Sequence, residues 1–173
     1  SDVCSSDLIV PSTKEIGFRN QILRGFVHDQ GAAFMGGVAG HAGLFSNTTD
    51  IACILQMLLN GGVWKGKRYL NQKTIEYFTG YQSNGSRRGL GFDKPEKNNA
   101  TRTDYYPAKS CSLKTFGHTG FTGTCAWADP ENELIFVFLS NRIYPSENDI
   151  FKTLNIRVKV FEAVYQELNK HKE

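Results

Sequence analysis

Two glycine-rich stretches carry the residues of this chain whose types and spacing could do chemistry. They are GGVAGHAGLFS, residues 36–46, and FGHTGFTG, residues 116–123. Each places a histidine, His41 or His118, among residues without bulk, which leaves the imidazole accessible to a substrate or ligand. Glycine also permits positive φ angles and close approach of another chain segment, so tight backbone packing is the alternative interpretation of both stretches.

The spacing of the remaining reactive side chains argues against several common sites. The four histidines and four cysteines are His28, His41, His118, His171, Cys4, Cys53, Cys111 and Cys125. They form no HxH, HxxxH or CxxC pair, so we expect no metal and no cofactor. The first stretch lacks the GxxxxGK[ST] pattern of a phosphate loop, and neither GxSxG nor Ser-x-x-Lys occurs anywhere in the chain. The chain taken alone therefore shows no catalytic nucleophile.

Helices are predicted between the two glycine-rich stretches. NTTDIACILQMLLNGG indicates a helix capped by Asn47, with apolar residues on one face and Gly61-Gly62 as its stop. A second, shorter helix is predicted over residues 71–78, with Ile75 and Phe78 on one face. Residues 83–109 read as loop, interrupted by a short strand at residues 89–92.

The second stretch belongs to a region of predicted strands. LKTFGH and TGTCAWAD are followed by turn formers at residues 129–132 and then by ELIFVFLSN, a pattern typical of a hairpin. Residues 134–139 are apolar on both alternating faces, so we expect that strand inside a sheet with both faces covered. Cys125 and Trp127 alternate on the preceding strand and are interpreted as packing residues.

The C-terminal segment predicts a long amphipathic helix. Its apolar residues recur at steps of three and four: Ile150, Leu154, Val158, Phe161, Tyr165 and Leu168. Together with the strands this gives an α+β fold, an antiparallel sheet flanked by helices. No internal repeat or linker divides the chain, so we expect part of one domain over residues 9–173.

Composition excludes two classes of partner. The 173 residues include 20 lysines and arginines against 17 acidic residues, and the small excess is spread along the chain without a basic face, so nucleic acid is not an expected partner. The longest apolar run, residues 134–139, is far shorter than the roughly 18 residues of a membrane span. Residues 1–8, SDVCSSDL, resemble the translation of a sequencing-library adapter and are excluded from the fold as an artefactual scar. The natural protein is then expected to continue upstream.

The order of the motifs carries a family resemblance. GGVAGHAGLFSNTTDIACILQMLLNGG, GLGF, GHTGFTGTCAWADPENELIFVFLSNR and the C-terminal helix together resemble the C-terminal portion of the β-lactamase-related serine hydrolases. That superfamily includes class C β-lactamases, D-alanyl-D-alanine peptidases and esterases. Through FLSNRIYPSENDIFKTLNIRVKVFEAVYQ the chain is most similar to the serine hydrolase module fused to some bacterial family-3 glycoside hydrolases. The resemblance covers nearly everything from Ile9 onward.

The resemblance implies roles for individual residues. His118-Thr119-Gly120 matches the family's Lys-Thr-Gly box, and Phe121 follows it where the family uses a backbone N–H as an oxyanion-hole donor. Loss of one such donor typically costs about 2.7–4 kcal/mol of transition-state stabilisation. A side chain at Gly120 is expected to obstruct the substrate's approach to the strand. These four residues are the catalytic candidates.

Other residues of the resembling region are candidates for substrate binding. His41 and Gly123 lie in it, but no chemical step can be assigned to His41 from the sequence. The family's lysine helps to bind substrate carboxylates, and histidine is mostly neutral at pH 7 where lysine is cationic. His118 therefore indicates an ester or amide substrate of less anionic character. The alternative is that His118 only makes a hydrogen bond within the strand pair.

The family's nucleophile motifs are not found in their expected place. Ser-x-x-Lys and Tyr-x-Asn both precede the resembling region in the family; Tyr69-Leu70-Asn71 matches the second by letter only, in the wrong order. We therefore expect this polypeptide to be inactive alone, as one part of a periplasmic or cell-envelope serine hydrolase. Its partners would be a small-molecule or envelope substrate, the missing N-terminal part and a fused glycoside hydrolase. A non-catalytic binding, sensor or accessory module of the same fold is the alternative.

Overall fold

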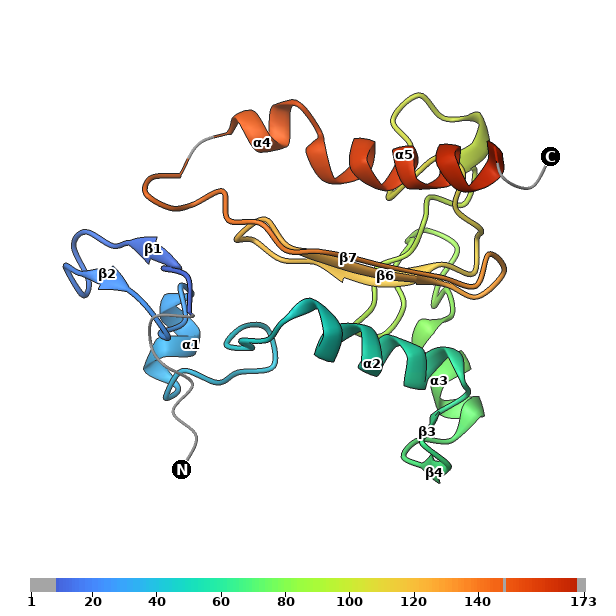
Figure 1. The fold of residues 1–173 in the computed structure, drawn as a ribbon, viewed down its shortest axis with the longest axis horizontal. Helices are drawn as coiled ribbons and strands as arrows, with labels where there is room; N and C mark the ends of the chain where they lie inside the picture. Colours follow the sequence, from blue (N-terminus) through green and yellow to red (C-terminus); the bar gives the residue numbers. More distant parts are fainter. Residues whose placement is uncertain (1–8, 148, 171–173) are drawn as a thin grey trace.

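The computed structural model describes residues 9–147 and 149–170. The adapter-like residues 1–8 with Cys4, and His171 near the other end, lie outside the described residues. The predicted α+β fold is confirmed: an antiparallel sheet lies between helices on its two faces (Figure 1).

Three strands form the central sheet. They are β5 (Phe116–Thr119), β6 (Cys125–Asp129) and β7 (Leu134–Phe138), hydrogen-bonded in the order β5-β6-β7 with both pairings antiparallel. His118 lies opposite Ala126 in the register. The hairpin predicted between residues 129 and 134 joins β6 to β7 and is confirmed.

Helix α2 (Thr48–Leu59) covers one face of this sheet (Figure 1). It begins as predicted, because the Asn47 side chain accepts a hydrogen bond of 3.0 Å from the backbone N–H of Asp50. Its apolar face packs on the sheet in a buried cluster of Leu55, Phe116 and Ala128. Strand β5, which carries the histidine-bearing stretch, is thus supported from below by α2.

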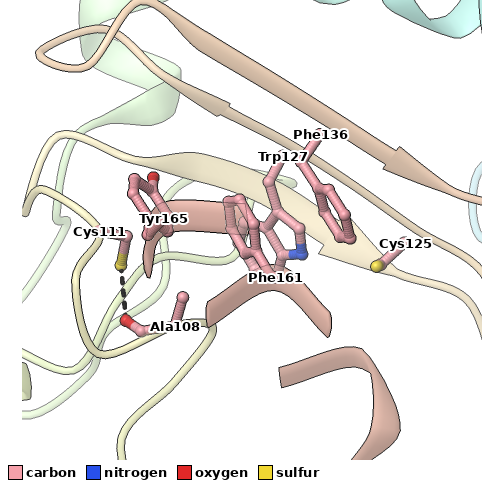
Figure 2. Packing of buried hydrophobic residues seen from close by; sticks show 7 residues of the cluster. All are labelled: Ala108, Cys111, Cys125, Trp127, Phe136, Phe161 and Tyr165. Atoms are coloured by element: carbon pink, nitrogen blue, oxygen red, sulfur yellow. Dashed lines mark hydrogen bonds between the residues drawn. The ribbon is translucent and has the colours of Figure 1, made fainter. Parts of the chain in front are cut away.

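Helix α5 (Ile156–Lys170) covers the other face (Figure 1). Figure 2 shows its aromatic side chains packed against those of the sheet, with the ring centroids of Phe161 and Phe136 4.4 Å apart. Trp127 and Cys125 are almost fully buried in the same cluster, which confirms their interpretation as packing residues.

Two predicted elements differ from the observed ones. The C-terminal helix is broken into α4 (Ile150–Thr153) and α5, because Asn155 adopts a left-handed φ of 52° that an α-helix cannot contain. Strand β7 lies at the edge of the three-stranded sheet and not inside it. Helices cover both of its faces, but of its five residues only Phe136 is buried.

The region between α2 and β5 is also partly different. Helix α3 (Gln72–Thr79) is confirmed and buries Ile75, but Phe78 is 44% exposed and does not share that buried face. Residues 89–92 form no strand; instead Asp93 makes an isolated antiparallel bridge to Gly117. The local pattern indicated extended chain, but only one residue beyond it pairs with the sheet.

Short elements complete the described chain. A two-residue hairpin of β3 (Val63–Trp64) and β4 (Lys67–Arg68) follows α2, and a 3-10 turn, η2, spans Asn99–Thr101. The N-terminal unit consists of β1 (Thr13–Lys14), β2 (Ile22–Leu23) and α1 (Gln30–Phe34). The hydroxyl of Thr13 ties this unit to the segment after β7 by donating to the Ile143 carbonyl. No helix within the described ranges is long and apolar enough to cross a membrane.

Candidate active site

Strand β5 sets the orientation of the predicted box. Gly117 exchanges two backbone hydrogen bonds with Asp93, of 2.7 and 3.1 Å, on the edge of β5 that faces away from β6. In an antiparallel ladder alternate residues direct their N–H and C=O groups to opposite edges. Thr119, the last residue of β5, follows Gly117 at a step of two, so its backbone groups are directed to that same outer edge, where an extended substrate could pair. Phe121 lies in the turn that follows the strand.

Two arginines hold the turn that follows the strand. Arg157 donates to the carbonyl of Gly120 at 2.9 Å, and Arg142 Nε donates to the carbonyl of Phe121 at 2.8 Å. Among residues 9–147 and 149–170, the Phe121 N–H makes no hydrogen bond. The carbonyls are bound by cationic donors while the N–H is left for a ligand, which is the polarity that an oxyanion site needs.

The Phe121 ring connects this turn to the N-terminal unit. It stacks on the His28 imidazole with centroids 5.3 Å apart and an interplanar angle of 14°. The guanidinium carbon of Arg142 lies 4.3 Å from its centroid, and Lys152 Nζ lies 5.6 Å away. The ring is nevertheless 55% exposed, so the box ends beside an accessible surface that carries positive charge.

Glycine is required at positions 120 and 123 by packing and backbone conformation within the hairpin. A Cβ atom at Gly120 would stand 2.3 Å from Thr124 Oγ1. Gly123 adopts a φ of 121°, and its carbonyl accepts a hydrogen bond of 2.7 Å from Ser140 Oγ. A side chain at Gly120 would thus meet the hairpin itself before any substrate, and the backbone conformation at Gly123 requires glycine.

The His118 side chain has two hydrogen-bond partners, and together they define which ring nitrogen carries the hydrogen. Its Nδ1 lies 2.8 Å from the Thr119 carbonyl, which can only accept, so Nδ1 carries the hydrogen. Its Nε2 lies 3.2 Å from Arg88 Nη1, which can only donate, so Nε2 must offer a lone pair. Both contacts agree on the neutral Nδ1–H tautomer, an assignment made from the hydrogen-bond partners.

Arg88 is the residue of this site that sequence reasoning missed. The motif itself contains only His118 as a titratable side chain, whereas the fold places a permanent cation, Arg88, beside it from 30 positions away. The pair Arg87-Arg88 preceding GLGF was the available signal, but nothing in the sequence relates that loop to β5. The expectation of a less anionic substrate rested on His118 alone and stays a prediction, beside which the structure places the positive charge of Arg88.

A buried carboxylate organises the arginine loop. Asp93 is 1% exposed, and Arg87 contacts it through Nε at 3.1 Å and Nη2 at 3.1 Å, while Arg88 Nε stands farther away at 3.5 Å. The Tyr106 hydroxyl donates to the same carboxylate at 3.0 Å. Burial and the neighbouring Asp93 charge raise the pKa of Tyr106 to about 12, so that it remains a donor at neutral pH.

His41 lies in a second polar arrangement. Its Nε2 is 2.9 Å from Asp29 Oδ1, and the same carboxylate caps α1 by accepting from the Ala32 N–H at 2.7 Å. That backbone hydrogen bond, together with His41, holds the pKa of Asp29 below its ordinary value. Within the part of the chain that the structure describes, no hydrogen bond or ring contact joins His41 to β5; His28, next to Asp29, makes the connection through Phe121.

An open hollow of about 820 Å³ lies beside Asp29. Its lining comes from β1, the start of α1 and the segment after β7: Thr13, Lys14, Glu15, Ile16, His28, Asp29, Gln30, Gly31, Pro145, Ser146 and Glu147. In the described ranges no group of three or more histidine, cysteine or acidic side chains could hold a metal ion. The chemistry available here is polar and acid–base.

Comparison with known proteins shows the family to which the chain belongs. A family model described as beta-lactamase matches residues 11–161, so the chain belongs to the beta-lactamase family. It is 42% identical over 139 residues, 80% of this chain, to a protein of Escherichia coli K12 named "Putative D-alanyl-D-alanine carboxypeptidase". A protein of Salmonella enteritidis PT4 with the same name is 42% identical over 125 residues, 72% of this chain.

A solved structure supports the fold. The crystal structure of a β-lactamase from Mycobacterium bovis matches with a TM-score of 0.50 and 21% sequence identity, covering 72% of this chain and 46% of that one. The chain spans 31% of the length of the E. coli relative and 28% of the Salmonella relative.

Proposed function

We propose that this chain is the C-terminal part of a serine hydrolase that cleaves an ester, amide or lactam through an acyl-enzyme. The serine oxygen would form a bond to the substrate carbonyl carbon, the leaving group would depart with a proton, and water would release the acid. Family membership and relatives named as D-alanyl-D-alanine carboxypeptidases support this class of reaction. A D-alanyl peptide of the cell envelope is the substrate that those names suggest, which would place the protein in the periplasm or envelope.

The arrangement of the turn after β5 carries the proposal. In this turn the Phe121 N–H makes no hydrogen bond to any described residue, while arginines bind the carbonyls of Gly120 and Phe121. A tetrahedral intermediate develops negative charge on the substrate oxygen, and an N–H donor together with nearby guanidinium groups stabilises that charge. The nucleophile and its base would come from the part of the domain that precedes this chain.

Active-site labelling of the whole polypeptide that carries this chain tests the proposal. A fluorophosphonate probe should mark a single serine, and the labelled protein should lose hydrolysis of p-nitrophenyl acetate in proportion. The 173-residue chain alone should neither label nor hydrolyse nitrocefin or p-nitrophenyl acetate. A whole polypeptide that takes up no probe, or hydrolysis by the 173-residue chain itself, would contradict the proposal.

A binding or accessory role is the second candidate, and the histidine in place of the family's lysine favours it. In that case the domain would hold an envelope carbohydrate or peptide, or would support a fused glycoside hydrolase. Deletion of the domain would then change solubility and leave glycosidase turnover per folded molecule unchanged. The reading frame upstream discriminates between the two roles, because only the enzyme needs Ser-x-x-Lys and Tyr-x-Asn there.

A further inference from the structure

The arginine beside the box histidine points to the substrate class of the proposed site. We propose that Arg88 is its specificity-determining residue: it holds His118 as a neutral acceptor and presents a permanent positive charge to a substrate carboxylate. This inference deepens the proposed hydrolase function and rests on it.

The two hydrogen-bond partners of His118 favour its neutral form. An imidazolium would direct an Nε2–H at the Arg88 guanidinium, so protonation of Nε2 and the 3.2 Å contact exclude each other. The Nδ1–H bond to the Thr119 carbonyl favours the same neutral form. His118 therefore contributes position and a lone pair to the site, and the charge comes from Arg88.

The positive charge of Arg88 is accessible to a ligand. Asp93 pairs with both arginines, with Arg87 Nε at 3.1 Å and with Arg88 Nε at 3.5 Å, and Glu96 lies 3.6 Å from Arg87. The Arg88 side chain is 51% exposed, and a guanidinium has five N–H donors, of which one contacts His118 and the Nε–H faces Asp93, so that the others can reach a ligand. Planar paired donors on an accessible guanidinium fit a carboxylate.

The other two arginines of the site, Arg142 and Arg157, bind groups of the chain itself. Arg157 donates to the carbonyls of Gly120 and Thr124, and Arg142 binds the Phe121 carbonyl and Glu147. These two guanidinium groups are engaged in holding the turn. Arg88 is placed differently, since it approaches the box from the loop that the Asp93–Gly117 bridge fixes against β5.

The test measures the His118 tautomer and anion selectivity in the whole polypeptide that carries this chain. Histidine-selective ¹⁵N NMR at neutral pH should show a protonated Nδ1 and an unprotonated Nε2 at His118. Arg88→Ala should change the Nε2 shift, and Arg88→Lys should largely restore it. Lys73→Ala, which removes one positive charge from an exposed position on α3, is the matched control and should leave the spectrum unchanged.

Binding of two probes completes the test. N-acetyl-D-alanine carries a carboxylate, and N-acetyl-D-alaninamide is its neutral counterpart. Arg88→Ala should weaken binding of the carboxylate about tenfold, the effect of losing one charge-assisted hydrogen bond at a half-exposed site, and leave the amide unchanged. Equal loss for both probes, or no loss for either, would overturn the inference, as would an unmoved His118 spectrum. If the serine fails to label while carboxylate selectivity follows Arg88, the hydrolase proposal fails and the Arg88 assignment stands.

Discussion

The stability of the sheet and of α5 should depend on one buried carboxylate, Asp129 at the end of β6. It is fully buried and accepts hydrogen bonds from Ser112 Oγ at 2.6 Å, the Tyr165 hydroxyl at 2.6 Å and Asn132 Nδ2 at 2.8 Å. Burial pushes the pKa of Asp129 up, but the hydrogen bonds from Ser112, Tyr165 and Asn132 outweigh burial and lower it from 3.8 to about 2. The charged form is thus the one that the fold stabilises.

The pKa shift sets the size and the pH window of the effect. A shift of nearly two units corresponds to about 2 kcal/mol of folding free energy, since each unit is worth roughly 1.4 kcal/mol. A carboxyl whose folded pKa is depressed contributes this stability above its unfolded pKa and loses it as the pH falls through the folded pKa. Asp129→Asn should therefore lower the free energy of unfolding by about 2 kcal/mol at pH 7, and by progressively less below pH 4.

Urea unfolding followed by tryptophan fluorescence measures this directly, because Trp127 lies buried in the cluster that also contains Tyr165. The melting temperature should fall by roughly 4–8 °C at neutral pH. Glu131→Gln is the control: Glu131 is 51% exposed, pairs only loosely with Lys114, and should change stability by less than about 0.5 kcal/mol. A deficit of Asp129→Asn that is the same at pH 7 and pH 2.5 would refute the reasoning.

Two further predictions concern packing around the box. Gly117→Ala should destabilise the fold by about 3 kcal/mol or more, because a Cβ there would stand 2.1 Å from a carbonyl oxygen of β6; Gly40→Ala, which meets open space, should have little effect in the same urea titration. Burial raises the pKa of Cys111 and of Cys125 to about 11, so at pH 8 both thiols should react with Ellman's reagent far more slowly than the half-buried Cys53. Equal rates for all three in the folded protein would contradict that burial.

Local patterns in the sequence were sufficient for the elements that are defined by their own residues. The cap at Asn47 and the turn formers after Asp129 act within three or four positions, so α2 and the β6–β7 hairpin could be predicted. The break at Asn155 could not, because apolar periodicity continues through it and only the left-handed backbone interrupts the helix. The edge position of β7 was missed for a related reason: an apolar strand reads the same whether or not another strand pairs with it.

The sequence motif of the candidate site does not reveal the positive charge that lies beside it in the fold. His118 to Phe121 could be identified from sequence, but the charge beside them depends on a contact between segments far apart in the chain. Asp93 supplies that contact: its backbone bridges Gly117, and its side chain gathers Arg87 and Tyr106. A side chain at Gly117 would clash with β6, so glycine is needed for the pairing of β5 with β6. The same residue also pairs with Asp93 on its other edge. That bridge places the loop containing Arg88 beside His118.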